Sequence, residues 1–514
     1  IRDVAVTGVQ TCALPISPGG HMLHGSAWMI SLRWAIRLTG LVSTIILARL
    51  LTPADFGIVA MAMIVVGMLE VLNQTGQKLA LIRLENPTDD HYNSAWTISA
   101  LIGFGIGIAI FLIAPLTTAY FHEPRAIVVM QCLGLRAFVG GLENIGTVDF
   151  RRELRFDRFF RYNVYPKLAS FVVTVTLAIW LRNYWALVAG ILTGQFTLTA
   201  LSYIMHPYRP RPSLKKVGEI WSFSIWTFFK TLGSYLNARI DQIAIGGVVG
   251  AASMGRYSVA SDVASSPSQE VNDPMLAVLF PVMSRYQDDL PQMRALYLRT
   301  LSWSAIICMS SSVGITLVAP EFVRLVLGPQ WIDVVPLMGW LALSAGVLGL
   351  ASSAYVLFDA TGKPHIGARM QWLRVIVLAT VVAPVAFLTQ SLVEVAAARF
   401  FVSCLVAPTL FLVAGSLIGL SVRHYINALW RPFTAAAAMA GAVLLLDTAL
   451  PLAGNLKLAF NVVSGAIVFT SSLLLLWQLS GKPQSPELDI VTFLYARLKK
   501  PAPSPVPSPL PPGS

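Results

Sequence analysis

The sequence predicts an all-α polytopic membrane protein with about 14 transmembrane helices, and its composition and apolar runs carry that prediction. Of the 514 residues, 55% are hydrophobic and only 12% are charged, whereas average soluble proteins carry roughly 25% charged residues. The mean hydropathy is +0.68. A chain of this kind lacks the polar surface with which a soluble enzyme covers its core. Disordered, fibrous and disulfide-scaffold classes are excluded by the same composition.

The apolar runs give the expected spans in order. They lie near 27–48, 57–80, 93–117, 125–146, 161–181, 184–205, 219–248, 255–283, 300–328, 333–358, 366–388, 391–420, 432–452 and 456–478. Several are longer than about 25 residues, so we expect tilted helices or interfacial turns. Twelve or thirteen spans remain open alternatives.

Basic residues alternate between the loops. Loops after even-numbered runs are rich in cations, such as Arg151, Arg152, Arg155, Arg158 and Arg161, whereas loops after odd-numbered runs hold mostly one cation. We assign Lys363, Arg369 and Arg374 to one of the basic loops. Positive residues stay inside, so both termini are predicted to be cytoplasmic. The net charge of +12 therefore reflects topology, and no nucleic-acid partner is expected.

Residues 1–16, IRDVAVTGVQTCALPI, agree residue by residue with the translation of a sequencing-library adaptor. They lack the basic start and long apolar stretch of a signal peptide. We therefore expect residues 1–21 to be a non-native leader and the natural start to be Met22.

An internal repeat predicts how the helices are grouped. RLLTPADFGIVAMA (Arg49–Ala62) follows the first run and VVGAASMGRYSVAS (Val248–Ser261) follows the seventh, which aligns Gly57 with Gly255 about 200 residues later. The repeat favours two six-helix lobes plus two C-terminal helices; chance similarity between apolar segments is the alternative. The expected divisions are a leader (1–21), an N-lobe (22–205), a basic cytoplasmic linker (206–218), a C-lobe (219–421), two further helices (422–480) and an amphipathic segment with a Pro-rich tail (481–514).

Polar residues at helical spacing mark the candidate site. A charge at the membrane midplane costs roughly 2.5–3.5 kcal/mol, so it needs a partner, a watery cavity or a function. The residues expected to line a central cavity come from spans one, two, seven and eight: Arg33, Arg37, Glu70, Gln74, Lys230, Asn237, Arg239, Asp241, Asp262 and Gln269. Two alternatives stay open, namely that Arg33 reaches the membrane interface and that the charges of spans seven and eight form structural pairs.

Other charged residues within the spans are interpreted as structural. Arg136 and Glu143 lie seven residues apart on one helix face, so we expect them to pair with each other, and Arg399 and Glu394 are given a structural role in the same way. Cys132, Cys308 and Cys404 fall in apolar runs and are expected to be small core residues. Neither the cysteines nor the seven histidines suggest a metal or cofactor site. The sequence has no GxSxG, HExxH or P-loop motif, so no enzyme activity is expected.

Several segments together resemble a known family: ILARLLTPADFGIVAMA (Ile46–Ala62), FRRELRFDRFFRY (Phe150–Tyr162), MGRYSVASDVASSP (Met254–Pro267), LFPVMSRYQDD (Leu279–Asp289) and VLGPQWIDVVPLM (Val326–Met338). They are similar to the polysaccharide transporter family of the multidrug/oligosaccharidyl-lipid/polysaccharide flippase superfamily. The resemblance implies a flippase of the bacterial inner membrane whose cavity opens to one side at a time. Its substrates would be undecaprenyl-diphosphate-linked oligosaccharides for capsule, exopolysaccharide or O-antigen, and its partners membrane lipids and the polysaccharide polymerase machinery.

The candidate residues suit that substrate. Arg33, Arg37, Lys230 and Arg239 would bind the diphosphate by charge-assisted hydrogen bonds, and the acidic residues would contact sugar hydroxyls or couple a cation. Two alternatives remain. A multidrug antiporter of the same superfamily would use Glu70, Asp241 or Asp262 as cation sites. A membrane polysaccharide polymerase or ligase would usually need a large outside loop, and no outside loop here exceeds about twenty residues.

Overall fold

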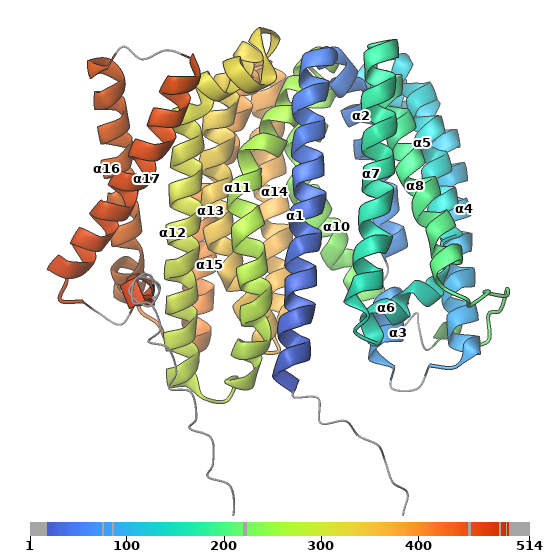
Figure 1. The fold of residues 1–514 in the computed structure, drawn as a ribbon, viewed down its shortest axis with the longest axis horizontal. Helices are drawn as coiled ribbons and strands as arrows, with labels where there is room; N and C mark the ends of the chain where they lie inside the picture. The colour runs from blue at the N-terminus through green and yellow to red at the C-terminus, as the bar shows by residue number, and fades with distance from the viewer. Residues whose placement is uncertain are drawn as a thin grey trace, which may run out of the picture. The chain divides into compact units, whose positions relative to one another are not determined.

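The computed structural model describes residues 18–74, 77–84, 87–218, 224–450, 454–482, 485–489 and 491–492. Every regular element within these ranges is helical (Figure 1). The long helices are α1 (Pro18–Leu50), α2 (Pro53–Glu70), α4 (Asp89–Phe121), α5 (Arg125–Gly141), α7 (Phe156–Leu181), α8 (Trp185–Met205), α10 (Ser224–Gly246), α11 (Gly250–Arg285), α12 (Leu290–Phe322), α13 (Val335–Ala360), α14 (Pro364–Thr389), α15 (Leu392–Ile418), α16 (Val422–Ala449) and α17 (Gly454–Leu479). The expected leader lies mostly outside the described residues, and α1 begins at Pro18, ahead of the expected start at Met22.

The helices confirm a polytopic membrane protein, but the expected number of spans is not reached. Within the described ranges, eleven helices are long and apolar enough to cross a membrane. A pair bent by 74°, α5 and the segment Ile145–Arg152, brings the number to twelve. The long helices that do not qualify are α10 and α11, because charged and hydroxyl side chains interrupt their apolar character. A count of fourteen therefore stays a prediction.

The chain divides into two compact units, and the boundary falls inside two helices. The first unit is Ile1–Arg239 with Val249–Gly255, and the second is Ile240–Val248 with Arg256–Ser514. Both α10 and α11 therefore contribute residues to each unit. The boundaries of the two predicted lobes remain a prediction.

The TPADFG segment at the start of α2 has a clear local reason to turn and then form a helix. Thr52 caps the helix, and its backbone N–H donates to Asp55 Oδ2 at 3.0 Å. Pro53 occupies the first turn of the helix, where a backbone N–H would have no partner within the helix, so its absence costs no hydrogen bond. The other carboxylate oxygen of Asp55 accepts the backbone N–H of Tyr184 at 3.0 Å. One buried carboxylate thus ties the start of α2 to the start of α8 within the first unit.

The two glycines aligned by the internal repeat mark a close helix contact in the first unit. A Cβ atom on Gly57 of α2 would overlap the backbone of Ala251, and one on Gly255 of α11 would overlap that of Pro53. Gly57 and Gly255 are separated along the chain by the same number of residues as Pro53 and Ala251. The aligned positions therefore meet in space, and only glycine allows the backbones to approach this closely.

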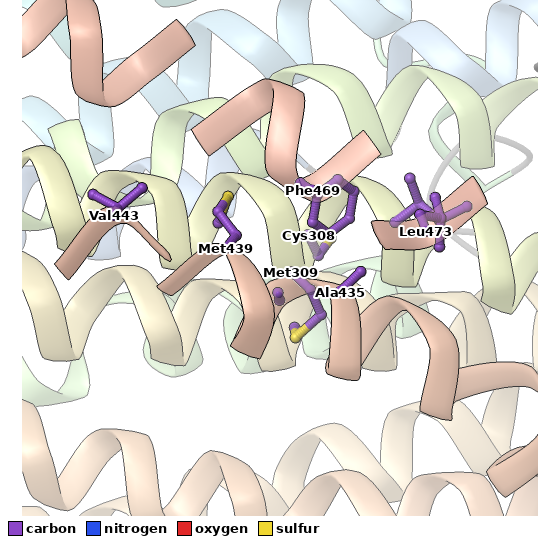
Figure 2. Packing of buried hydrophobic residues seen from close by; sticks show 9 residues of the cluster. Cys308, Met309, Ala435, Met439, Val443, Phe469 and Leu473 are labelled. Atoms are coloured by element: carbon purple, nitrogen blue, oxygen red, sulfur yellow. The ribbon is translucent and has the colours of Figure 1, made fainter. Parts of the chain in front are cut away.

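In the second unit, α12, α16 and α17 share an apolar core. Figure 2 shows Met309 of α12, Met439 of α16 and Phe469 of α17 among its members. Cys308 belongs to this core and is fully buried, as expected for a small core residue. Cys404, for which the same was expected, is exposed on α15. The apolar run alone did not show which face of that helix it occupies.

The segment that follows α17 contacts helices of the second unit. Arg431 of α16 and Glu487 form a buried ion pair at 2.9 Å, and Arg299 of α12 reaches Asp489 at 2.5 Å. Residues 485–489 are therefore fixed by the helices of the second unit. Most of the predicted amphipathic segment and all of the Pro-rich tail lie outside the described residues.

Candidate functional site

The first unit contains a polar cavity of about 440 Å³. Its wall is built from the end of α2, the start of α3 (Gln77–Arg83), α4, α5 and α8. The charged residues that line it are Glu70, Lys78, Arg136, Glu143 and Arg151. Asn73, Gln77 and Gln195 add amide groups to the same wall.

Helix ends create this cavity. The predicted span 57–80 is interrupted, because α2 ends at Glu70, a short 3₁₀ turn covers Val71–Gln74, and α3 begins at Gln77. Opposite it, α5 ends at Gly141 and the chain bends by 74°. Each interruption brings polar side chains and backbone groups to a place that a continuous apolar helix would fill with hydrocarbon.

Asn144 holds the second interruption in place. Its side chain accepts the backbone N–H of Gly146 at 3.0 Å and donates to the backbone oxygen of Tyr208 at 2.7 Å. Its own backbone N–H donates to Ser202 Oγ at 2.9 Å. Asn144 is fully buried, so these bonds replace the contacts with water that its polar groups lose.

The ion pairs of the cavity differ from the predicted one. Arg136 pairs with Glu70 of α2 at 3.1 Å. Glu143 instead binds Lys78 at 2.7 Å and accepts the hydroxyl of Tyr162 at 2.5 Å. The expected Arg136–Glu143 pair was therefore wrong, because each residue finds a nearer partner on another helix. The side chains of Arg136 and Glu70 stay 27% and 20% exposed, which keeps their charges available at the cavity wall.

The structure places the predicted site residues in several environments. Among the described side chains of the predicted set, Glu70 lines the cavity. Arg33 and Arg37 lie partly buried on α1, and Arg239 lies partly buried on α10; each of the three makes an interaction, but none lines this cavity. The side chains of Gln74 and Lys230 lie outside the described residues.

The other residues of the predicted site differ in how deeply they are buried. Asn237 is buried on α10, and its amide has no hydrogen-bond partner among the described residues. Asp262 and Gln269 are exposed on α11. Asp241 is fully buried, and its Oδ2 accepts from the Arg399 guanidinium and from the Tyr257 hydroxyl.

This arrangement does not bring the predicted cavity set together as a whole. Glu394, the acidic residue noted near Arg399, is exposed in the first turn of α15. Arg399 has the structural role expected of it, but with a carboxylate from a different helix.

Sequence reasoning missed Lys78 and Arg151 as cavity residues. Arg151 looked like one of several loop cations, and Lys78 fell at the end of an apolar run. A usable signal was present in the sequence, because Glu70, Asn73, Gln74 and Gln77 all interrupt the second apolar run within eight residues. Among the described residues, no group of three or more His, Cys, Asp or Glu side chains is placed to hold a metal ion.

Comparison with known proteins adds a family match to this geometry. Residues 46–336 match a family model described as "Polysaccharide biosynthesis protein". The chain is 24% identical over 419 residues to an "Uncharacterized membrane protein in cps region" of Klebsiella pneumoniae, covering 80% of this chain and 86% of that protein. It is 23% identical over 425 residues to the lipopolysaccharide biosynthesis protein WzxC of Escherichia coli (strain K12), covering 80% and 84% of the two chains.

A solved structure shows the shared fold. The chain is similar to the structure titled "Lipid II flippase MurJ, inward closed conformation" with a TM-score of 0.72, at 14% identity. The similarity covers 89% of this chain and 99% of the other.

Proposed function

The chain belongs to the polysaccharide biosynthesis protein family, and we propose that it is a membrane transporter, not an enzyme, and acts as a flippase for lipid-linked oligosaccharides. The proposed substrate is an undecaprenyl-diphosphate-linked sugar repeat for capsule, exopolysaccharide or O-antigen. The proposed location is the bacterial inner membrane, with both termini in the cytoplasm.

The observation that carries this proposal is the charged cavity of the first unit. A lipid-linked sugar presents many hydroxyl groups and about two negative charges, so its passage through hydrocarbon needs polar surface. The cavity offers three cations, two carboxylates and three amides. Its volume of about 440 Å³ falls within the range of roughly 300–1,000 Å³ that is typical of ligand pockets.

The ion pairs argue against a cation-coupled multidrug antiporter. Such a protein would use Glu70, Asp241 or Asp262 as cation sites. Glu70 is paired with Arg136, and Asp241 with Arg399. A carboxylate whose charge a guanidinium already neutralises has little affinity for a further cation. The transporter family likewise argues against a polymerase or ligase.

The deciding test is export of lipid-linked glycan in cells that lack their own flippase, with protein abundance in the membrane measured alongside. Arg136→Gln is expected to reduce export per molecule at least tenfold while abundance stays within twofold of the unmodified chain, because the side chain lies partly exposed at the cavity wall. Arg125→Gln is the matched control, because Arg125 lies on the same helix and pairs with Glu123 away from the cavity.

A double variant separates substrate binding from a structural ion pair. Removing both charges with Glu70→Gln and Arg136→Gln would restore export if Arg136→Gln fails only because it leaves the Glu70 carboxylate without its cation. We expect export to stay low. Normal export by Arg136→Gln alone would remove the cavity from the mechanism, and no export of any glycan by the unmodified chain would contradict the proposed function.

A further inference from the structure

The second unit contains a buried arginine with unused hydrogen-bond donors. Arg374 lies in the interior of α14 and is 8% exposed. Its Nε and Nη2 atoms are buried and have no hydrogen-bond partner among the described residues. We expected Arg374 in a basic loop; that assignment was wrong, because helix α14 continues for more than ten residues beyond it.

The neighbours of Arg374 do not neutralise it. The charges of Arg399 and Asp241 and the hydroxyl of Tyr355 act on its guanidinium. Asp241 already binds Arg399 and Tyr257 through Oδ2. The single carboxylate of Asp241 therefore lies near two buried guanidinium groups, those of Arg374 and Arg399. These three side chains together carry one positive charge in excess.

The geometry of the unused donors specifies the missing partner. Nε and Nη2 lie on the same edge of the planar guanidinium, so their two N–H bonds run parallel. That edge matches two oxygens of one phosphate or carboxylate group. A guanidinium does not lose its proton in proteins, and an unpaired buried charge is strongly unfavourable. Tyr355 adds a second unused polar group nearby, because its buried hydroxyl has no partner among the described residues either.

We propose that Arg374 is the centre of an oxyanion-binding site in the second unit, where it takes a phosphate-type group through its Nε–Nη2 edge. Arg399, fixed by Asp241, adds positive potential to this site, and the Tyr355 hydroxyl is available as a further donor. The identification of the oxyanion as the diphosphate of a lipid-linked sugar rests on the proposed function. The binding of an inorganic oxyanion does not.

The test is binding of inorganic pyrophosphate to the purified full chain in nanodiscs of zwitterionic lipid. Calorimetry gives the affinity, and sodium chloride keeps the ionic strength constant. We expect Arg374→Gln to weaken binding at least tenfold, and Arg374→Lys to give an intermediate affinity because it keeps the charge but loses the two-donor edge. Arg369→Gln is the matched control on the same helix; Arg369 is exposed, so its removal should leave the affinity unchanged.

Thermal unfolding without any oxyanion provides an independent readout. Arg374→Gln removes an unpaired buried charge, so its unfolding midpoint is expected to rise above that of the unmodified chain. Pyrophosphate should raise the midpoint of the unmodified chain and not that of the variant. A lower midpoint for Arg374→Gln without pyrophosphate would show that Arg374 has a structural partner, and would overturn the proposal. Equal pyrophosphate affinity in both proteins would overturn it as well.

Two further ligands identify the source of the oxyanion. Tighter binding of farnesyl diphosphate than of pyrophosphate would assign the site to a prenyl diphosphate headgroup, and tighter binding of glucuronate would assign it to an acidic sugar. Either result supports an oxyanion site. Pyrophosphate binding through Arg374 in a chain that exports no glycan would contradict the proposed function alone. If the chain exports glycan but Arg374→Gln leaves its pyrophosphate affinity unchanged, only the proposed oxyanion site is contradicted.

Discussion

Arg399 and Asp241 illustrate how a charged side chain is accommodated within the helices of the second unit. Their side chains are 11% and 1% exposed, and they pair directly. The hydroxyl of Tyr257 donates a further bond of 2.5 Å to the same carboxylate. Because both charges are removed from solvent, each depends on the other far more than the partners of an exposed ion pair do.

We expect Arg399→Gln to be destabilising, by about 3–5 kcal/mol, because Arg399 bonds the buried Asp241 carboxylate directly, whereas Arg374 acts on that carboxylate only through its charge. Combining it with Asp241→Asn should recover much of the loss, since no uncompensated carboxylate then remains. Membrane abundance and the thermal unfolding midpoint measure both effects.

Glu394→Gln is the control for this pair, because Glu394 lies exposed in the first turn of the same helix as Arg399. It should change stability little. If Arg399→Gln and Glu394→Gln had the same unfolding midpoint, the buried Arg399–Asp241 pair would contribute nothing to the stability of the protein.

At the scale of elements, the contact between α2 and the first turns of α11 depends on two small residues. Gly57 and Gly255 each face the backbone of the opposite helix at a separation that leaves no room for a methyl group. Alanine normally favours a helix over glycine by about 1 kcal/mol. Here the steric overlap opposes that preference, because backbone atoms cannot move aside as a flexible side chain can.

Gly57→Ala and Gly255→Ala are each expected to destabilise the protein by about 1–3 kcal/mol, seen as a lower unfolding midpoint. Gly105→Ala is the control, because a Cβ atom at Gly105 of α4 would meet nothing within 4 Å. That variant should be neutral or slightly stabilising. A midpoint for Gly57→Ala as high as that for Gly105→Ala would contradict the tight contact.

The polar helices α10 and α11 explain why the structure has more long helices than candidate membrane spans. Each predicted apolar run overlaps one long helix, yet α10 and α11 are not apolar enough to count as membrane spans. Asp241 on α10 is buried against Arg399, so at that position the helix is shielded by protein. A helix that neighbouring helices shield can carry charges that lipid would not tolerate.

At the scale of the whole molecule, the distribution of basic residues predicts topology. Reporter fusions at Arg158 and after Lys482 should report the cytoplasm, because the positively charged loops remain inside. A fusion at Arg182, in the short connection between α7 and α8, should report the opposite side. Alkaline phosphatase activity and fluorescence of a fused protein measure the two sides. A periplasmic signal at Arg158 or after Lys482 would contradict the predicted alternation.

The sequence alone determined the helical membrane class, the family and the positions of most helices. These features depend on local composition, because an apolar run must satisfy its backbone hydrogen bonds within one helix wherever it lies in the bilayer. The alignment of Gly57 with Gly255 also came from sequence, since a backbone contact that excludes a Cβ atom restricts both positions to glycine.

Only the tertiary structure decided which charges meet. Arg136 binds Glu70 instead of Glu143, Arg399 binds Asp241 of another helix, and Arg374 lies inside α14 instead of in a loop. Helical periodicity places side chains on a face but does not specify which helix packs against that face. Partners that are more than 60 residues apart in the sequence, such as Glu70 and Arg136, are brought together by packing, and the free energy of each charge depends on that neighbour.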